Sequence, residues 1–151
     1  FVSNVASRAT KYKKLGAFSY VLGVLGELAA LNATPLRIDI DGETYEREAI
    51  FVEICNSRLT GGNMIMSPDS ILDDGLLDVV IVSKVTRRKL LRLFPTLFKG
   101  THVHNESVEV VRGKHITVES TELLGLNIDG ETFGKTPMEI NVVPGAIEMY
   151  G

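Results

Sequence analysis

The sequence predicts a mainly β protein, a two-sheet antiparallel β-sandwich decorated by two helices at residues 10–31 and at about residues 86–99. The main observation is a series of short apolar or alternating segments after residue 102, separated by turn dipeptides about every eight to twelve residues. Such spacing is typical of a sandwich or a barrel. The length of 151 residues, with 44% hydrophobic and 23% charged residues, fits one folded domain.

The first helix is predicted by apolar residues that recur at helical spacing: Leu15, Phe18, Leu22, Leu25 and Leu28. Asn32 and Pro35 end it. The second helix begins at Thr86, a good N-cap residue, and ends at Gly100. Pro95 must kink or interrupt it.

Strands fill most of the remaining chain. The Asp41–Gly42 dipeptide predicts a hairpin between residues 36–41 and 44–55, and the apolar run at residues 77–83 predicts a buried strand. The C-terminal strands are expected at residues 103–111, 114–119, 122–128, 138–143 and 146–150. Turns at Arg112–Gly113, Asp129–Gly130 and Pro144–Gly145 separate them.

The net charge of −3 conceals a segregation of charge along the chain. Residues 1–26 and 79–105 together hold 10 of the 16 basic residues and none of the 19 acidic residues. The net charge excludes a uniformly basic nucleic-acid-binding protein. Basic clusters beside apolar residues can attract an anionic membrane surface, and two solvated helix faces are the alternative.

A single cysteine, Cys55, excludes an internal disulfide framework and a cysteine-based zinc site. It lies in an apolar strand and is expected to be inert. His102 and His104 would share one face of a strand, which gives either half a metal site or two surface histidines. Gly61 and Gly62 can let a ligand approach the backbone, although a turn is the simpler interpretation.

An acidic loop follows Ser67 and carries Asp69, Asp73, Asp74 and Asp78. Carboxylates on a glycine-bearing loop, together with free backbone carbonyls, can bind a hard cation such as Mg²⁺ or Ca²⁺. A solvated acidic turn is the alternative.

One pentapeptide occurs twice, at residues 40–44 and again at residues 128–132, as Ile-Asp-Gly-Glu-Thr. Asp-Gly before a strand-forming residue is good hairpin chemistry, so both copies predict turns. Glu43 and Glu131 can each act as a general base if a suitable partner lies nearby. Spacing and composition do not distinguish the two glutamates, and an exposed residue at a strand end is the alternative for either one.

Several motifs occur together in a particular order: Asn56, Thr60–Met64, Ser67–Val79, Asn127–Glu131, Thr136–Pro137 and Val142–Ala146. In this order and spacing they resemble the second domain of the lipid kinases related to diacylglycerol kinase, a family that includes sphingosine and ceramide kinases. The resemblance covers nearly the whole chain. It implies a β-sandwich that binds the lipid substrate beside an α/β nucleotide domain.

The resemblance also implies roles for individual residues. Glu131 would be the catalytic base, and Glu43 would belong to an ordinary hairpin. The side chain of Asp74 and the backbone carbonyls of Ile71 and Leu76 would hold Mg²⁺, with Asp73 and Asp78 as supporting charges. ATP would be held mainly by the N-terminal domain through a Gly-Gly-Asp-Gly-Thr signature, which is absent from this sequence.

The sequence therefore predicts the substrate-binding and catalytic-base domain of an ATP-dependent lipid kinase, inactive as an isolated fragment. Its expected partners are a lipid, its own N-terminal domain and a peripheral anionic membrane surface, with no nucleic acid. The expected location is cytoplasmic, at the inner membrane surface. An NAD kinase-like domain and a non-catalytic β-sandwich module are the alternatives. The sequence does not indicate which lipid is used.

Overall fold

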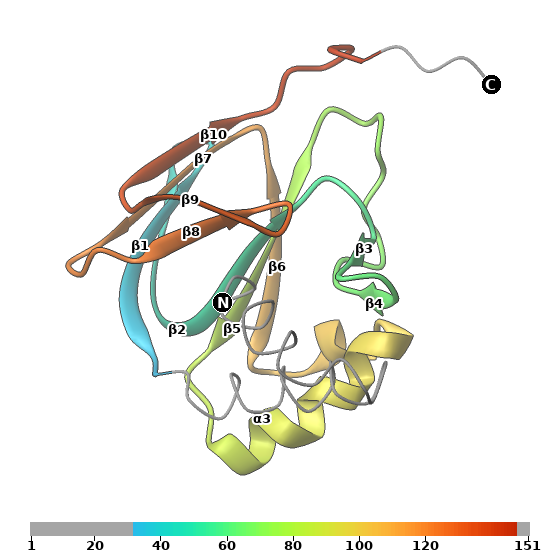
Figure 1. Cartoon of the computed structure of the whole chain (residues 1–151), viewed down its shortest axis with the longest axis vertical. Coiled ribbons are helices and arrows are strands. Elements are labelled where there is room, and N and C mark those ends of the chain that lie inside the picture. The colour runs from blue at the N-terminus through green and yellow to red at the C-terminus, as the bar shows by residue number, and fades with distance from the viewer. Residues whose placement is uncertain (1–31, 148–151) are drawn as a thin grey trace.

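The structure, a computed structural model, describes residues 32–147 (Figure 1). The helix predicted at residues 10–31 lies outside this range, as does most of the strand predicted at residues 146–150. The strands are β1 (Thr34–Ile40), β2 (Glu43–Cys55), β3 (Leu59–Thr60), β4 (Met64–Ile65), β5 (Leu77–Ser83), β6 (Val108–Gly113), β7 (His115–Ser120), β8 (Gly125–Ile128), β9 (Glu131–Lys135) and β10 (Met138–Asn141).

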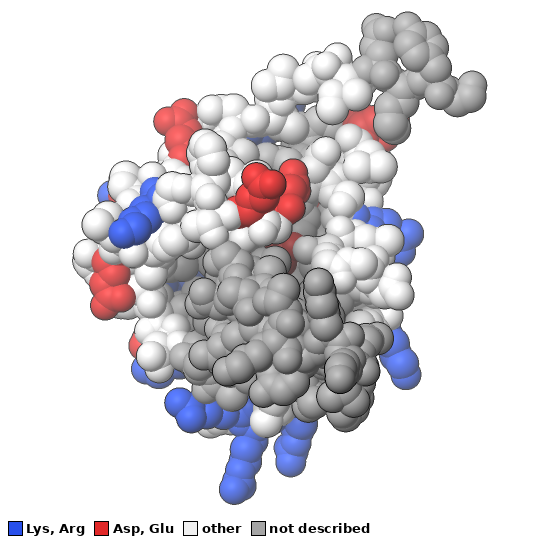
Figure 2. All heavy atoms as spheres, in the orientation of Figure 1, with Lys and Arg blue, Asp and Glu red and all other residues white. Residues whose placement is uncertain are grey.

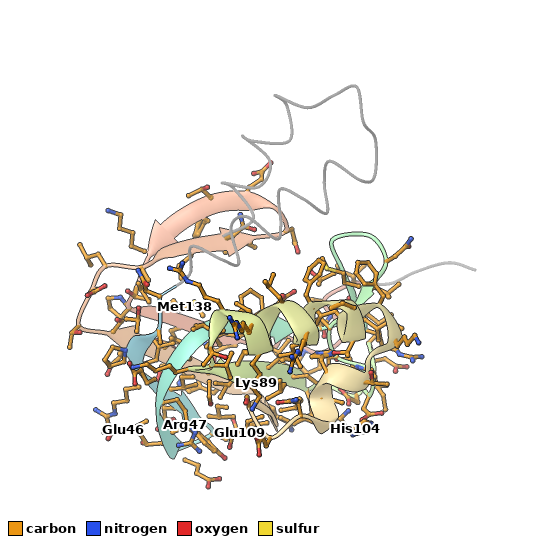
Figure 3. The ribbon with its side chains drawn as sticks, turned by 90° about the horizontal axis from the view of Figure 1, so that it is seen from below. Glu46, Arg47, Lys89, His104, Glu109 and Met138 are labelled. Atoms are coloured by element: carbon orange, nitrogen blue, oxygen red, sulfur yellow. The ribbon has the colours of Figure 1, made fainter. Side chains whose placement is uncertain are left out.

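One large sheet dominates the fold. Its six strands lie in the order β10-β7-β1-β2-β5-β6, and every neighbouring pair is antiparallel. The β3–β4 and β8–β9 pairs form two further ribbons. The β8–β9 ribbon lies across one face of the large sheet as a second layer (Figures 1 and 3). The predicted mainly β, antiparallel fold is confirmed.

Strand β5 lies between two hydrophobic cores. Val79 and Ile81 pack on one face of the sheet, against β1 and β7. Val80 and Val82 pack on the other face, where Leu93 covers them. A strand buried on both faces needs a continuous apolar run rather than alternation, which explains why residues 77–83 predict a buried strand.

The second predicted helix forms as α3 (Arg87–Leu93), continued by a 3₁₀ helix, η2 (Phe94–Lys99). The hydroxyl of Thr86 caps α3 by accepting a hydrogen bond from the Lys89 backbone N–H at 3.3 Å. Pro95 lies at the start of η2, where the α-helical pattern ends, and Gly100 follows it with a left-handed φ of 68°. No helix within residues 32–147 is long and apolar enough to cross a membrane.

The strand predicted at residues 103–111 is partly wrong. A 3₁₀ helix, η3 (Thr101–His104), comes first, and β6 starts only at Val108. His102 is buried and donates a hydrogen bond from Nε2 to the carbonyl of Met66 at 2.9 Å. This contact turns the chain inward, so His102 and His104 do not form the expected surface pair.

Candidate functional site

Glu131 is the first residue of β9, directly after the turn of the β8–β9 hairpin. Asp129 and Gly130 have φ values of 49° and 92°, which a two-residue hairpin turn of the primed type requires. The side-chain oxygen of Asn127 accepts a hydrogen bond from the Gly130 backbone N–H at 3.1 Å and fixes this turn. The carboxylate of Glu131 is exposed and has no hydrogen-bond or ion-pair partner among the described residues.

The first copy of the pentapeptide forms the same turn between β1 and β2. Asp41 and Gly42 have φ values of 53° and 89°, and Asp39 accepts a hydrogen bond from the Gly42 N–H at 2.9 Å. Here, however, the carboxylates are engaged. Asp41 accepts hydrogen bonds from the backbone N–H groups of His115, at 2.9 Å, and Lys114, at 3.1 Å.

Glu43 is engaged as well, because a side-chain hydrogen bond with it raises the pKa of Tyr45. Asp41 of the first turn thus holds a neighbouring part of the fold, whereas Glu43 contacts a residue of its own strand. The acidic groups of the second turn, Asp129 and Glu131, project without partners in the described part of the chain. The two copies share a backbone geometry and differ in which of their carboxylates remain available.

Thr136 anchors the base of the β8–β9 hairpin. Its buried hydroxyl donates to the Glu122 carbonyl and accepts from the Leu124 N–H, each at 3.0 Å. Leu124 in turn packs against the core of the large sheet. The hairpin is therefore held at its base, while its turn and Glu131 remain exposed.

The hairpin surface combines acidic and apolar groups. Three large apolar side chains are exposed along it, Leu123 by 72%, Ile128 by 49% and Phe133 by 67%. Figure 2 shows acidic side chains gathered over the hairpin tip, where Asp129 and Glu131 lie. Such a surface can present a carboxylate to a ligand that also has an apolar part.

The acidic loop is tied to the large sheet through Asp78. This carboxylate is buried; one oxygen accepts from the Ser70 hydroxyl at 2.7 Å and the other from Arg112 Nε at 2.8 Å. Arg112 also donates to the Asp69 carbonyl, and the hydrogen bond with Asp78 raises the pKa of its guanidinium. Both oxygens of Asp78 thus have partners within the fold, and its role as a supporting charge for a cation stays a prediction.

Asp74 lies at the exposed end of the same loop. Its Oδ1 accepts a hydrogen bond from the Leu76 N–H at 2.9 Å, and Gly75 between them has a φ of 72°. A Cβ at Gly75 would lie 3.5 Å from Cγ of Pro144, so the loop lies beside the C-terminal segment.

The predicted magnesium ligands have oxygen atoms that remain free. The second carboxylate oxygen of Asp74 and the carbonyls of Ile71 and Leu76 accept no hydrogen bond from another described residue. Oxygen atoms of this kind are the ligands that Mg²⁺ prefers. Within residues 32–147 no cluster of three His, Cys, Asp or Glu side chains could hold a metal ion, and the predicted set uses only one such side chain.

The other candidates are structural. Cys55 is buried, and desolvation raises its thiol pKa to about 12, which fits the expected inert cysteine. Gly61 and Gly62 have φ values of 53° and 99° and form the turn between β3 and β4.

The sequence pattern predicts no supporting role for Arg112, Thr136 or Asn127. A signal existed for Asn127 alone, because an Asp or Asn precedes both copies of the turn at the same spacing, as Asp39 and Asn127.

Comparison with known proteins identifies relatives of this chain. A diacylglycerol kinase of Mycobacterium tuberculosis (strain H37Rv) is 36% identical over 153 aligned residues, which cover 99% of this chain and 48% of that protein. A diacylglycerol kinase of Bacillus subtilis (strain 168) is 28% identical over 83% of this chain and 41% of its own length. The chain thus spans about half the length of these relatives.

A solved structure with a similar fold also carries the name diacylglycerol kinase. A putative diacylglycerol kinase from Bacillus anthracis matches with a TM-score of 0.72 and 27% identity, over 93% of this chain and 47% of that one. The family described as the YegS C-terminal NAD kinase beta sandwich-like domain matches residues 2–151. This chain therefore belongs to the YegS C-terminal domain family, whose relatives include proteins named diacylglycerol kinase.

Proposed function

We propose that this chain is the substrate-binding and catalytic-base part of an ATP-dependent kinase that phosphorylates the hydroxyl of a diacylglycerol-like lipid. The observation that carries the proposal is the contrast between the two Asp-Gly-Glu turns. Glu43 and Asp41 are engaged within the fold, whereas Glu131 is exposed and without a partner among residues 32–147. The names of the relatives supply the reaction class.

In this proposal Glu131 accepts the proton of the lipid hydroxyl while the hydroxyl oxygen attacks the γ-phosphorus of ATP. The new bond joins the lipid oxygen to that phosphorus, the bond to the β,γ-bridging oxygen breaks, and ADP leaves. Asn127 holds the turn that presents Glu131. The exposed apolar groups Ile128 and Phe133 would contact the acyl part of the lipid.

We also propose that Asp74, with the carbonyls of Ile71 and Leu76, holds a Mg²⁺ ion. Bound there, the ion would neutralise charge in the acidic loop. It would fix the loop beside Pro144 and the C-terminal segment, which Gly75 approaches closely. A separate Mg²⁺ would accompany ATP for phosphoryl transfer.

The nucleotide site would belong to another domain, because this sequence lacks the Gly-Gly-Asp-Gly-Thr signature. The chain of 151 residues is accordingly expected to phosphorylate no lipid by itself. Turnover by the purified chain, free of contaminating kinase, would contradict this assignment.

The test is a matched pair of substitutions in the whole protein, Glu131→Gln and Glu43→Gln, assayed for transfer of labelled phosphate from ATP to diacylglycerol. Loss of a general base reduces kcat by roughly 10²- to 10⁴-fold. That loss is expected for Glu131→Gln, while Glu43→Gln stays within about twofold. An unchanged rate in Glu131→Gln would favour a non-catalytic lipid- or protein-binding module.

The same assay tests the NAD kinase-like alternative, since the description of the matching family includes an NAD kinase-like fold. Diacylglycerol and NAD are offered separately to the wild-type protein. Phosphorylation of NAD alone would replace the lipid proposal.

A further inference from the structure

The segment around α3 and η2 carries an excess of free positive charge. Residues 79–105 contain six basic residues and no acidic residue. Two of the six are paired: Lys84 with Glu48 and Lys89 with Glu106, each at 2.7 Å. Figure 3 labels Lys89 on α3. The other four are exposed and have no ion-pair partner among the described residues: Arg87, Arg88, Arg92 and Lys99.

The free cations project from the side of α3 away from the core. Leu90 and Leu93 are buried and define the inner face of the helix. Arg88 and Arg92 are exposed and lie one turn apart, so they share a face. Figure 2 shows basic side chains extending from the lower edge of the molecule, where α3 lies. Like charges at this spacing destabilise a helix, so this arrangement does not serve helix stability.

Large apolar side chains lie among these cations. Leu91 on α3 and Phe98 on η2 are each 43% exposed. The ring of Phe98 packs edge-to-face on Phe94, with ring centroids 5.7 Å apart, which orders it while part of it remains in solvent. Basic residues interleaved with exposed leucine and phenylalanine are typical of surfaces that lie in a membrane interface.

We infer that this surface, formed by Arg87, Arg88, Leu91, Arg92, Phe98 and Lys99, docks onto an anionic lipid bilayer. The cations would lie among lipid phosphates, and Leu91 and Phe98 would enter the boundary with the acyl chains. The inference deepens the proposed function and rests on it only in taking the membrane as the source of the lipid substrate. A nucleic acid would satisfy the cations but offers no environment for the apolar side chains.

Charge segregation would also orient the molecule. The acidic hairpin tip with Asp129 and Glu131 lies apart from the basic edge (Figure 2). An anionic surface attracts the basic edge, so one orientation is preferred.

Vesicle flotation tests the electrostatic part with the full 151-residue chain. Binding to vesicles of equal phosphatidylglycerol and phosphatidylcholine is expected, with little binding to phosphatidylcholine alone and a steep decrease with salt. The triple variant Arg87→Glu, Arg88→Glu, Arg92→Glu should bind the anionic vesicles on the order of a hundredfold more weakly. The matched control Arg37→Glu, Arg58→Glu, Lys114→Glu changes the net charge equally elsewhere and should keep most binding.

A fluorescence measurement tests the apolar part. The chain contains no tryptophan, so Leu91→Trp places a single reporter on α3. Its emission should shift to the blue and become protected from iodide on anionic vesicles. Leu59→Trp, at a position exposed by 55% on β3, is the matched control and should remain accessible to iodide.

Equal binding by the two charge triples, or an unprotected Leu91→Trp, would overturn the inference. Binding of double-stranded DNA that is lost in the α3 triple, with no shift of the Leu91→Trp emission on vesicles, would replace the membrane by a nucleic acid. These readouts measure binding and not turnover. Failure here therefore leaves the kinase proposal intact, and loss of activity in Glu131→Gln leaves vesicle binding unchanged.

Discussion

Arg112 donates a hydrogen bond from Nε to Oδ1 of Asp78 at 2.8 Å and thereby joins strand β6 to the first residues of β5. Asp78 has a side-chain exposure of only 3%, whereas Arg112 is 37% exposed. The partly exposed Arg112 thus contacts the buried carboxylate of Asp78 from the solvent side. The hydroxyl of Ser70 donates a second hydrogen bond to this carboxylate. This arrangement fixes the end of the acidic loop from which Asp74 projects.

Arg112→Ala should destabilise the protein by about 2 kcal/mol, since it leaves a buried carboxylate with one partner fewer. The partial exposure of Arg112 keeps the loss below that of a fully buried pair. Denaturant unfolding measures the change. The control is Arg37→Ala, whose 3.8 Å pair with Glu119 is exposed on both sides and should contribute less than about 0.5 kcal/mol. Equal losses of unfolding free energy in the two variants would show that the burial of Asp78 does not determine the strength of its pair with Arg112.

Asp41 should make stability depend on pH in the acid range. The backbone N–H groups of His115 and Lys114 hold its pKa below the usual value of 3.8. Because the folded pKa is the lower one, the stabilisation is fully present above about pH 3.8 and is lost as pH falls through the folded pKa. Unfolding measured from pH 6 to pH 2 should show Asp41→Asn less stable than wild type at pH 6, with the difference decreasing as the pH falls below about 3.8.

Asp129→Asn is the control for that experiment, because Asp129 occupies the same turn position without a hydrogen-bond partner among the described residues. It should change the pH profile little. An equal effect of the two substitutions would mean that the contacts of Asp41 with His115 and Lys114 do not set the dependence.

Gly113 should not tolerate a side chain. A Cβ there would overlap Cγ2 of Ile40 and lie 3.0 Å from a carboxylate oxygen of Asp41. Gly113→Ala is expected to cost about 2 kcal/mol by overpacking. Gly125→Ala, where a Cβ meets nothing within 4 Å, is the control. In a double-mutant cycle, Ile40→Ala removes the clashing methyl, so the double variant should be more stable than the sum of the single losses implies.

Asp74→Asn should abolish Mg²⁺ binding at the acidic loop without loss of the local fold, since asparagine can still accept the hydrogen bond from the Leu76 N–H. Wild-type protein is expected to gain thermal stability as Mg²⁺ is added, by mass action. The Asp74→Asn variant should show no gain, and the control Asp73→Asn should behave as wild type. The same thermal shift in all three proteins would remove Asp74 from the proposed site.

Helices and strands could be predicted where a hydrophobic run, a capping residue or a proline determines the local structure. The apolar run at residues 77–83 predicts β5, and Thr86 with Pro95 predicts a capped, interrupted helix. Strand β9 was not predicted, because all five of its residues are exposed and no hydrophobic alternation marks it. The helical turn η3 was missed because His102 is held by the Met66 carbonyl, a partner distant in sequence.

In the candidate site, too, the sequence predicts some features and not those that depend on contacts in the fold. The residue pattern marked Glu131 and Asp74 as candidates, and the resemblance gave them roles that remain predictions. The pattern also grouped Asp78 with the other carboxylates of the acidic loop, and it does not indicate that the fold buries this residue against Arg112 and Ser70. It did not separate Glu43 from Glu131, although Tyr45, the partner of Glu43, lies two residues along the same strand and is replaced by Phe133 in the second copy.

The separation of the β8–β9 ribbon from the six-stranded sheet has a further consequence. Its ladder is shared with no other described strand, and its hold on the core passes through Thr136 and Leu124. Two-stranded ribbons are marginally stable by themselves, so this one can open at a free energy below that of global unfolding. The fold thus combines a cooperative frame with an arm whose local equilibrium can respond to a ligand without disturbing the frame.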